Sequence, residues 1–144
     1  MKYVNQLLEG KGKNIWSVEP DTPVFQALEL IAEKNCGAVL VRKDERLLGI
    51  LSERDYARKV MLKGKSSKDI PVKSIMSSQV VCIRTNQTID ECMALMTDKR
   101  IRHLPVLENE KLVGVISIGD VVKAVISEQE FLISQLENYI TGTQ

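Results

Sequence analysis

The apolar residues of this chain recur at two spacings. Intervals of three and four residues predict two amphipathic helices, because residues at that spacing share one helix face. Short continuous apolar runs predict strands that are covered on both faces. The two helical stripes consist of Val24, Ala27, Leu28 and Ile31, and of Ile89, Cys92, Met93 and Met96. The apolar runs are 38–41 and 47–51 in the first half of the chain, and 104–107 and 112–116 in the second.

A displacement of 65 residues superimposes one half of this pattern on the other without a gap, from about residue 16 to residue 126. Each half is therefore predicted to be one copy of a repeat made of a strand, a helix, two strands and a second helix. The first strands are expected at 15–18 and 80–83. Thr88 with Glu91 has the spacing of a capping box, and Pro23 suits a first helical turn.

The repeat divides the chain into five segments. Because about 50 residues are few for an independent core, we expect the two copies to pack sheet against sheet as one α/β domain. A short helix is expected over 3–9, and the last helix should continue beyond the repeat through Val125, Leu132, Leu136 and Ile140. The segments are an N-terminal helix and lead-in (1–14), the first repeat (15–64), a linker (65–79), the second repeat (80–127) and a C-terminal helix extension (128–144).

Composition narrows the class of protein. The chain has 144 residues, 44% of them hydrophobic and 27% charged, as in soluble globular proteins. A net charge of +1 gives no general attraction to nucleic acid or to a membrane surface, so neither is predicted as a partner. Without a membrane-length apolar run or a signal peptide, a cytoplasmic location is expected. Cys36, Cys82 and Cys92 are then expected to be reduced and mostly buried.

Candidate chemistry lies where the last strand of each copy meets its last helix, in a duplicated Gly-x-x-Ser-x-x-Asp segment. A helix N-terminus attracts phosphate through its free N–H groups. Ser52 and Ser117 can cap the helix and donate to a phosphate, while Asp55 and Asp120 can accept both hydroxyls of a ribose. The same serine and aspartate would also stabilise any helix without a ligand. The segments run from Gly49 to Asp55 and from Gly114 to Asp120.

Two stretches carry a family resemblance: GILSERDYARKV at 49–60 and RIRHLPVLENEKLVGVISIGDVV at 100–122. The sequence resembles the CBS-domain family over residues 15 to about 127, as a tandem pair called a Bateman module. The resemblance implies an α/β fold of two pseudo-symmetric β-α-β-β-α repeats packed as one module. It also implies two nucleotide clefts between the copies, a homodimer, and regulation of a partner protein that the sequence does not identify. The implied ligands are AMP, ADP, ATP or NAD, with S-adenosylmethionine ranked behind them.

The resemblance also implies that each cleft combines the ribose ligand of one copy with phosphate ligands of the other. Arg54 is then assigned to the Asp120 cleft, and Arg102 and His103 to the Asp55 cleft. The alternative is structural. Arg54 could pair with Glu53 or Asp55, Arg102 with Asp98, and His103 could be an ordinary residue at a strand edge.

Adenine recognition in the family involves main-chain groups near the first strand and the start of the second, with apolar side chains around the ring. The matching positions are Trp16 and Cys36 for the Asp55 cleft. For the Asp120 cleft they are Val81 and Ile101. The Trp16 indole could stack on a base, or could serve only in the core or as a lid.

Other chemistries find little support. GKGK at 10–13 lacks the Walker A spacing, although Lys13 could reach a phosphate. One histidine and scattered cysteines predict no metal site, and no nucleophile stands beside an activating base, so no catalytic residue and no enzymatic activity are predicted. Two hypotheses remain: a regulatory module that senses adenine nucleotides, and a dimerising scaffold that binds none. The apolar stripe of the C-terminal helix favours the second.

Overall fold

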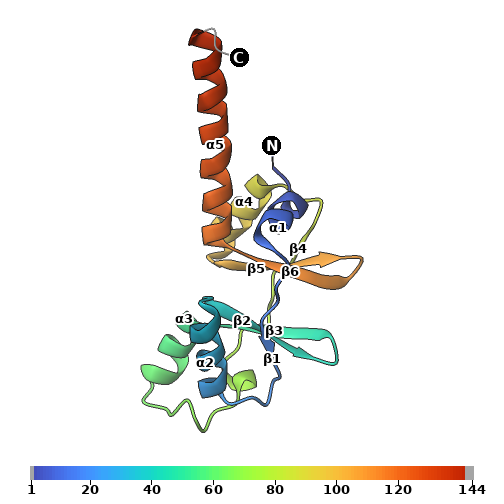
Figure 1. Cartoon of the computed structure of the whole chain (residues 1–144). Coiled ribbons are helices and arrows are strands. Elements are labelled where there is room, and N and C mark those ends of the chain that lie inside the picture. Colours follow the sequence, from blue (N-terminus) through green and yellow to red (C-terminus); the bar gives the residue numbers. More distant parts are fainter. Residues whose placement is uncertain (1, 142–144) are drawn as a thin grey trace. The chain divides into compact units, whose positions relative to one another are not determined.

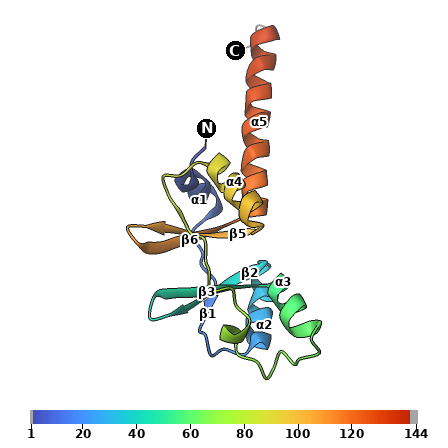
Figure 2. The same cartoon turned by 180° about the vertical axis from the view of Figure 1, so that it is seen from behind.

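The computed structural model describes residues 2–141, which form two compact units (Figure 1). One unit consists of residues 14–81, and the other combines the residues before Asn14 with those after Val81. Each unit contains a three-stranded sheet whose helices lie on one face of that sheet, which is also visible from behind in Figure 2.

The first unit contains the first repeat and the segment that follows it. Strand β1 is parallel to β2, and β2 is antiparallel to β3, in the order β1-β2-β3. Asn35 ends α2 in the left-handed conformation. The elements are β1 (Ser17–Val18), α2 (Val24–Lys34), β2 (Ala38–Lys43), β3 (Arg46–Ser52), α3 (Glu53–Tyr56), the π-helical turn η1 (Ala57–Met61) and the 3-10 turn η2 (Val72–Ser74).

The second unit repeats this topology in the order β4-β5-β6. Its register is also the same. Val18 pairs with Val41 in the first sheet, and their counterparts in the second copy, Ile83 and Val106, pair in the second sheet. The repeat predicted from the sequence is therefore confirmed at the level of single pairs. The elements are α1 (Val4–Lys11), β4 (Ile83–Arg84), α4 (Ile89–Lys99), β5 (His103–Glu108), β6 (Lys111–Ser117) and α5 (Ile118–Thr141).

Local signals in the sequence fix most helix ends. Thr88 and Glu91 form the expected capping box at the start of α4, with Glu91 N–H donating to Thr88 Oγ1 over 3.1 Å. Pro23 stands just before α2 and not within its first turn. The strands β1 and β4 are shorter than predicted, and α5 extends beyond the repeat as expected.

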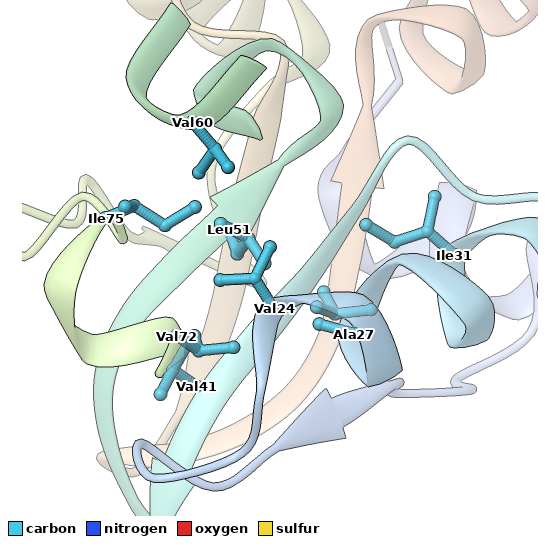
Figure 3. Packing of buried hydrophobic residues seen from close by; sticks show 9 residues of the cluster. Val24, Ala27, Ile31, Val41, Leu51, Val60, Val72 and Ile75 are labelled. Carbon is cyan, nitrogen blue, oxygen red and sulfur yellow. The ribbon is translucent and has the colours of Figure 1, made fainter. Parts of the chain in front are cut away.

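The core of the first unit forms where α2 covers β2 and β3 (Figure 3). Apolar residues at alternate positions of a strand point to one face, so β2 presents Val39 and Val41 to this cluster. Complete burial of a valine or leucine side chain contributes about 1.5–3 kcal/mol. The rest of the cluster is Val24, Ala27, Ile31, Leu51, Val60, Val72 and Ile75.

A second, shorter repeat precedes each copy, and sequence analysis had missed it. Residues 4–8 (VNQLL) and 72–76 (VKSIM) make equivalent contacts: Val4 N–H donates to Gln87 O over 2.9 Å, and Val72 N–H donates to Thr22 O over 2.8 Å. The two acceptors, Thr22 and Gln87, are separated by the 65-residue displacement of the main repeat. The two donors, Val4 and Val72, are separated by a different interval. We call these two stretches the lead-in segments. The first precedes the first repeat but belongs to the second unit, and the second precedes the second repeat but belongs to the first unit.

The three cysteines differ in burial. Within residues 2–141, Cys92 is buried, Cys36 and Cys82 are half-buried, and none forms a disulfide. Burial, with a smaller effect from the Glu91 charge, raises the pKa of Cys92 to about 11, so this thiol is unreactive near neutral pH. Across the described residues, no helix is both long enough and apolar enough to cross a membrane.

Candidate functional site

The first Gly-x-x-Ser-x-x-Asp segment forms a complete capping box at the start of α3. Asp55 N–H donates to Ser52 Oγ over 3.1 Å, and Ser52 N–H donates to Asp55 Oδ2 over 3.0 Å. The Ser52 hydroxyl also donates to Asp55 Oδ2, over 3.1 Å. Both side chains therefore have the helix-stabilising role that sequence analysis left open.

The second segment has the same geometry at the start of α5. Asp120 N–H donates to Ser117 Oγ over 3.1 Å, and Ser117 N–H donates to Asp120 Oδ2 over 2.8 Å. The Ser117 side chain, like its N–H, helps to hold the pKa of Asp120 low. Serine and aspartate are therefore partners of each other in both repeats.

A lysine neutralises each aspartate, and neither lysine was singled out from the sequence. Lys59 Nζ lies 3.3 Å from Asp55 Oδ1 and donates to Ile75 O over 2.9 Å. Lys11 Nζ donates to Asp120 Oδ2 over 2.5 Å and to Val115 O over 2.6 Å. The signal for Lys59 is its position four residues after Asp55 on one helix face. Lys11 stands in the GKGK segment, where we had singled out Lys13 instead.

The hydrogen bond from Lys11 to Val115 O stands where the first unit has a backbone hydrogen bond. In the first unit, Ser77 N–H donates to Ile50 O over 2.9 Å at the free edge of β3. Val115 is the counterpart of Ile50 in β6, and its carbonyl receives the Lys11 ammonium instead. Helix α1 continues to Lys11, whereas η2 ends at Ser74, so only a side chain reaches this edge in the second unit.

Charge and burial around Asp120 act in opposite directions. Burial raises the pKa of Asp120, but the Lys11 ammonium and the Ser117 N–H outweigh it, so the net pKa lies below its ordinary value. For His103, burial lowers the pKa, Lys11 lowers it further, and Asp120 partly opposes the shift. The second motif thus combines an ionised carboxylate with a neutral imidazole near pH 7.

The predicted phosphate ligands are placed as follows. His103 lies directly opposite Ser117 in the β5–β6 ladder, and Ile118 N–H donates to Arg102 O over 2.8 Å, so both residues adjoin the second motif of their own repeat. Arg54 lies on α3 and is exposed.

The ion pairs considered as alternatives for these arginines do not form. Asp55 pairs with Lys59, and Asp98 with Lys99. In the described part of the chain, Arg54 and Arg102 take part in no ion pair. Both guanidinium groups can therefore receive an anion without breaking an existing pair.

The residues predicted to surround adenine have main-chain groups already in use. Trp16 O accepts from Leu40 N–H over 3.0 Å, and the Trp16 ring packs on the first core with Lys34 Nζ 4.7 Å from its centroid. Cys36 N–H donates to Ile31 O, and Ile101 N–H donates to Met96 O, each over 3.1 Å.

Two predicted residues remain to be placed, and two others share one hollow. Val81 is half-buried at the end of the first unit, and Lys13 is exposed just after α1. Cys36 and Arg54, which we had assigned to different clefts, line one open hollow of about 600 Å³ beside α2 and α3.

Comparison with known proteins identifies the family. The CBS domain model matches residues 12–62 and 72–127, so the chain belongs to the CBS-domain family as a tandem pair, or Bateman module. A protein with CBS domains from Burkholderia ambifaria, solved as a candidate signal-transduction protein, is 48% identical. Its TM-score is 0.86, and the match covers 89% of this chain and 96% of that one. The fold class predicted from the sequence is confirmed.

Two further relatives are similar over most of their length. A solved CBS-domain structure is 50% identical, with a TM-score of 0.84, over 87% of this chain and 98% of that chain. The CBS domain-containing protein CBSX3 of Arabidopsis thaliana, a mitochondrial protein, is 36% identical over 96% of this chain and 72% of its own length. The names of these relatives describe them as CBS-domain proteins. Among the described residues, no group of three or more His, Cys, Asp or Glu side chains could hold a metal ion.

Proposed function

We propose that this protein is a regulatory module that binds an adenine nucleotide and acts on a partner protein through a change in packing. The observation that carries the proposal is the duplicated Ser–Asp geometry. Ser52 with Asp55, and Ser117 with Asp120, place a hydroxyl and a carboxylate beside a helix N-terminus in both repeats. Such a site offers an acceptor to ribose hydroxyls and donors to a phosphate.

The free cations support a phosphate-bearing ligand. Arg54 and Arg102 have no ion-pair partner within residues 2–141, so either guanidinium could bind a phosphate without breaking an existing pair. We assign Arg54 to the Asp120 cleft and Arg102 with His103 to the Asp55 cleft, as the family resemblance implies.

The second repeat also differs in the strand that would adjoin the adenine. Leu40 N–H donates to Trp16 O over 3.0 Å in the first repeat, but its counterpart in the second repeat is Pro105, which has no N–H. The equivalent bond to the carbonyl of Val81 is therefore impossible. This leaves a main-chain acceptor for the adenine amino group and supports Val81 as a ligand in the Asp120 cleft.

One relative supports an adenosine-containing ligand. The CBS domain pair of MJ0100 was solved with 5′-methylthioadenosine and S-adenosylmethionine. The match to inosine-5′-monophosphate dehydrogenase of Thermoplasma acidophilum covers 21% of that enzyme. Most of the enzyme therefore has no counterpart in this chain. For this protein we propose AMP, ADP, ATP or NAD as the ligand and a cytoplasmic location, although the Arabidopsis relative is mitochondrial.

Calorimetric titration with AMP, ATP and NAD tests the proposal. We expect binding by the wild-type protein, weaker binding after Asp55→Ala or Asp120→Ala alone, and none after both substitutions. Circular dichroism should show that the double variant keeps its helices. Absence of binding to the wild type, or unchanged binding by the folded double variant, would overturn the proposal.

A dimerising scaffold is the second candidate function, and α5 favours it. From Val125 onward no described residue of α5 is buried, and Leu132, Leu136 and Tyr139 are 54%, 61% and 85% exposed. A second copy is the partner that fits this face best. The seam keeps a heptad spacing with one amide, Gln129, which can pair with the same amide of another copy. The seam consists of Val122, Val125, Gln129, Leu132, Leu136 and Tyr139.

Sedimentation of a shortened chain tests this second function. Deletion of residues 130–144 should lower the mass of the assembly, and Leu136→Glu should do the same because it places a charge in the seam. Ser134→Glu adds the same charge on the opposite face of α5 and should leave the mass unchanged. An unchanged number of chains in the assembly after the deletion would exclude residues 130–144 as the essential dimer contact.

A further inference from the structure

Asp120 is already occupied on the side where a ribose would bind. A carboxylate oxygen has two lone pairs, and Asp120 Oδ2 accepts from Ser117 N–H over 2.8 Å and from Lys11 Nζ over 2.5 Å. Within residues 2–141, Oδ1 has no hydrogen-bond partner. Ribose hydroxyls could donate to Oδ1, but a diol that engages both carboxylate oxygens has to displace Lys11 from Oδ2.

In the first unit, Asp55 Oδ2 accepts from the Ser52 N–H and from the Ser52 hydroxyl, and the lysine faces the other oxygen. Lys59 Nζ lies 3.3 Å from Asp55 Oδ1, and its hydrogen bond goes to Ile75 O instead. Lys59 belongs to the same helical segment as Asp55, whereas Lys11 reaches Asp120 from α1, 109 residues away in sequence. Only at Asp120 does the neutralising lysine come from a segment that can move independently of the motif.

The position of Lys11 allows such movement. Lys11 is the last residue of α1, and Gly10 and Gly12 flank it; Gly12 has a φ of 103°, a conformation that other residues rarely adopt. The Lys11 side chain is 35% exposed and the Asp120 side chain 22%. Lys11 also lines an open hollow of about 350 Å³ between α1 and α5, which leaves room for the ammonium to swing away.

We propose that Lys11 is a gate on the second motif: its ammonium competes with the ribose diol for Asp120, and ligand binding releases the end of α1 from β6. Release also removes the Lys11 hydrogen bond to Val115 O at the edge of β6. The occupancy of the Asp120 cleft would thereby be reported to α1. The gate rests on the proposed nucleotide binding.

The ratio of the dissociation constants of 2′-deoxy-AMP and AMP isolates the competition, because the loss of a lysine charge affects the phosphate of both ligands equally. The ratio is measured by calorimetry in the Asp55→Ala background, which leaves the Asp120 cleft as the remaining site. We expect Lys11→Met to raise it about tenfold, the low end for a charge-assisted hydrogen bond at a partly exposed pair. Lys123→Met, which removes a lysine from the same hollow, should leave the ratio within about twofold.

The outcomes separate the gate from the function on which it rests. Asp120-dependent binding with an unchanged or lower ratio in Lys11→Met overturns the gate alone. If neither the Asp55→Ala protein nor its Lys11→Met variant binds AMP, both nucleotide binding at this motif and the gate are overturned. A second measurement uses the unmodified protein: Gly12 N–H donates to Leu8 O over 2.8 Å, and saturating AMP should speed its hydrogen exchange. Slower or unchanged exchange would contradict the gate.

Discussion

At the scale of single residues, the glycines of the duplicated motif are explained by packing against the lead-in segments. A Cβ added to Gly49 would lie 2.7 Å from Met76 Sδ and 2.8 Å from the carbonyl oxygen of Ser77. A Cβ added to Gly114 would lie 2.8 Å from Leu8 Cδ2. Both glycines therefore permit a close approach, and the approaching group is the protein itself.

Alanine at these two positions should have unequal costs. We expect Gly49→Ala to lower the free energy of unfolding by about 1–3 kcal/mol, because the Ser77 carbonyl is backbone and cannot rotate away. Gly114→Ala should cost less, since the end of the Leu8 side chain can change rotamer. Urea denaturation of the two variants measures the difference. A larger loss for Gly114→Ala would show that Leu8 is the more rigid neighbour.

The Lys11–Asp120 pair makes a second prediction at this scale, about pH. The pKa of Asp120 is lower in the folded protein than in the unfolded chain, so its contribution to stability is complete above the unfolded-state pKa and is lost as pH falls through the folded pKa. Lys11→Met should raise the pKa of Asp120, because burial then acts with less opposition, and should also raise that of His103.

Carboxyl and imidazole titrations by NMR measure both shifts. Lys123→Met is the matched control, because it removes a positive charge from the same hollow without touching the carboxylate. Equal shifts in the two variants would mean that general charge, and not the specific hydrogen bond, holds the pKa of Asp120 low.

At the scale of elements, the helices and strands that recur at the 65-residue displacement were predictable from the sequence. The lead-in segments, which recur at another interval, were not. The constant displacement between the two copies located the helices and strands of both repeats, since the register of each sheet follows it. The lead-in segments were missed because they recur at a slightly longer interval, and because a stretch as short as Val4–Leu8 has too few positions to stand out. Lys11 was missed for a related reason: its contact with Asp120 joins residues 109 apart.

The C-terminal end of α1 offers a prediction about helix chemistry. Gly10 lies within α1, and Gly12 follows it with a φ of 103°. A Cβ at either position would meet nothing within 4 Å, so only the backbone conformation differs. Gly10→Ala should raise the free energy of unfolding by about 0.5–1 kcal/mol, because alanine loses less conformational entropy in a helix. Gly12→Ala should lower it by about 1 kcal/mol or more, since alanine is strained at that φ.

Thermal unfolding of the two variants is a direct test, because each is the control for the other. A stabilising effect of Gly12→Ala would mean that the chain after α1 does not hold the left-handed conformation. By stiffening α1, Gly10→Ala should also strengthen the Lys11 contact with Asp120.

At the scale of the whole molecule, each compact unit is assembled from segments that are distant in sequence. Val4, Leu7 and Leu8 are buried in the unit of the second repeat, while Val72 and Ile75 are buried in that of the first. Each repeat thus lacks part of its core until the lead-in segment that precedes the other repeat has been added. The two copies therefore exchange segments, and each needs a stretch of chain that precedes the other repeat to complete its core.

This exchange predicts where a core substitution acts. Leu8→Ala removes a side chain that is 1% exposed and should cost about 2–5 kcal/mol, as should Ile75→Ala, whose side chain is 4% exposed. Although Leu8 precedes the first repeat, its substitution should increase hydrogen exchange mainly in α4, β5 and β6. Ile75 precedes the second repeat, but its substitution should increase hydrogen exchange mainly in α2, β2 and β3. The reason is that local opening follows the contacts that a segment makes and not its place in the sequence. Exchange measured by mass spectrometry on both variants gives the pattern, and equal loss of protection in the two units would mean that they unfold as one. The reverse pattern would contradict the assignment of the lead-in segments.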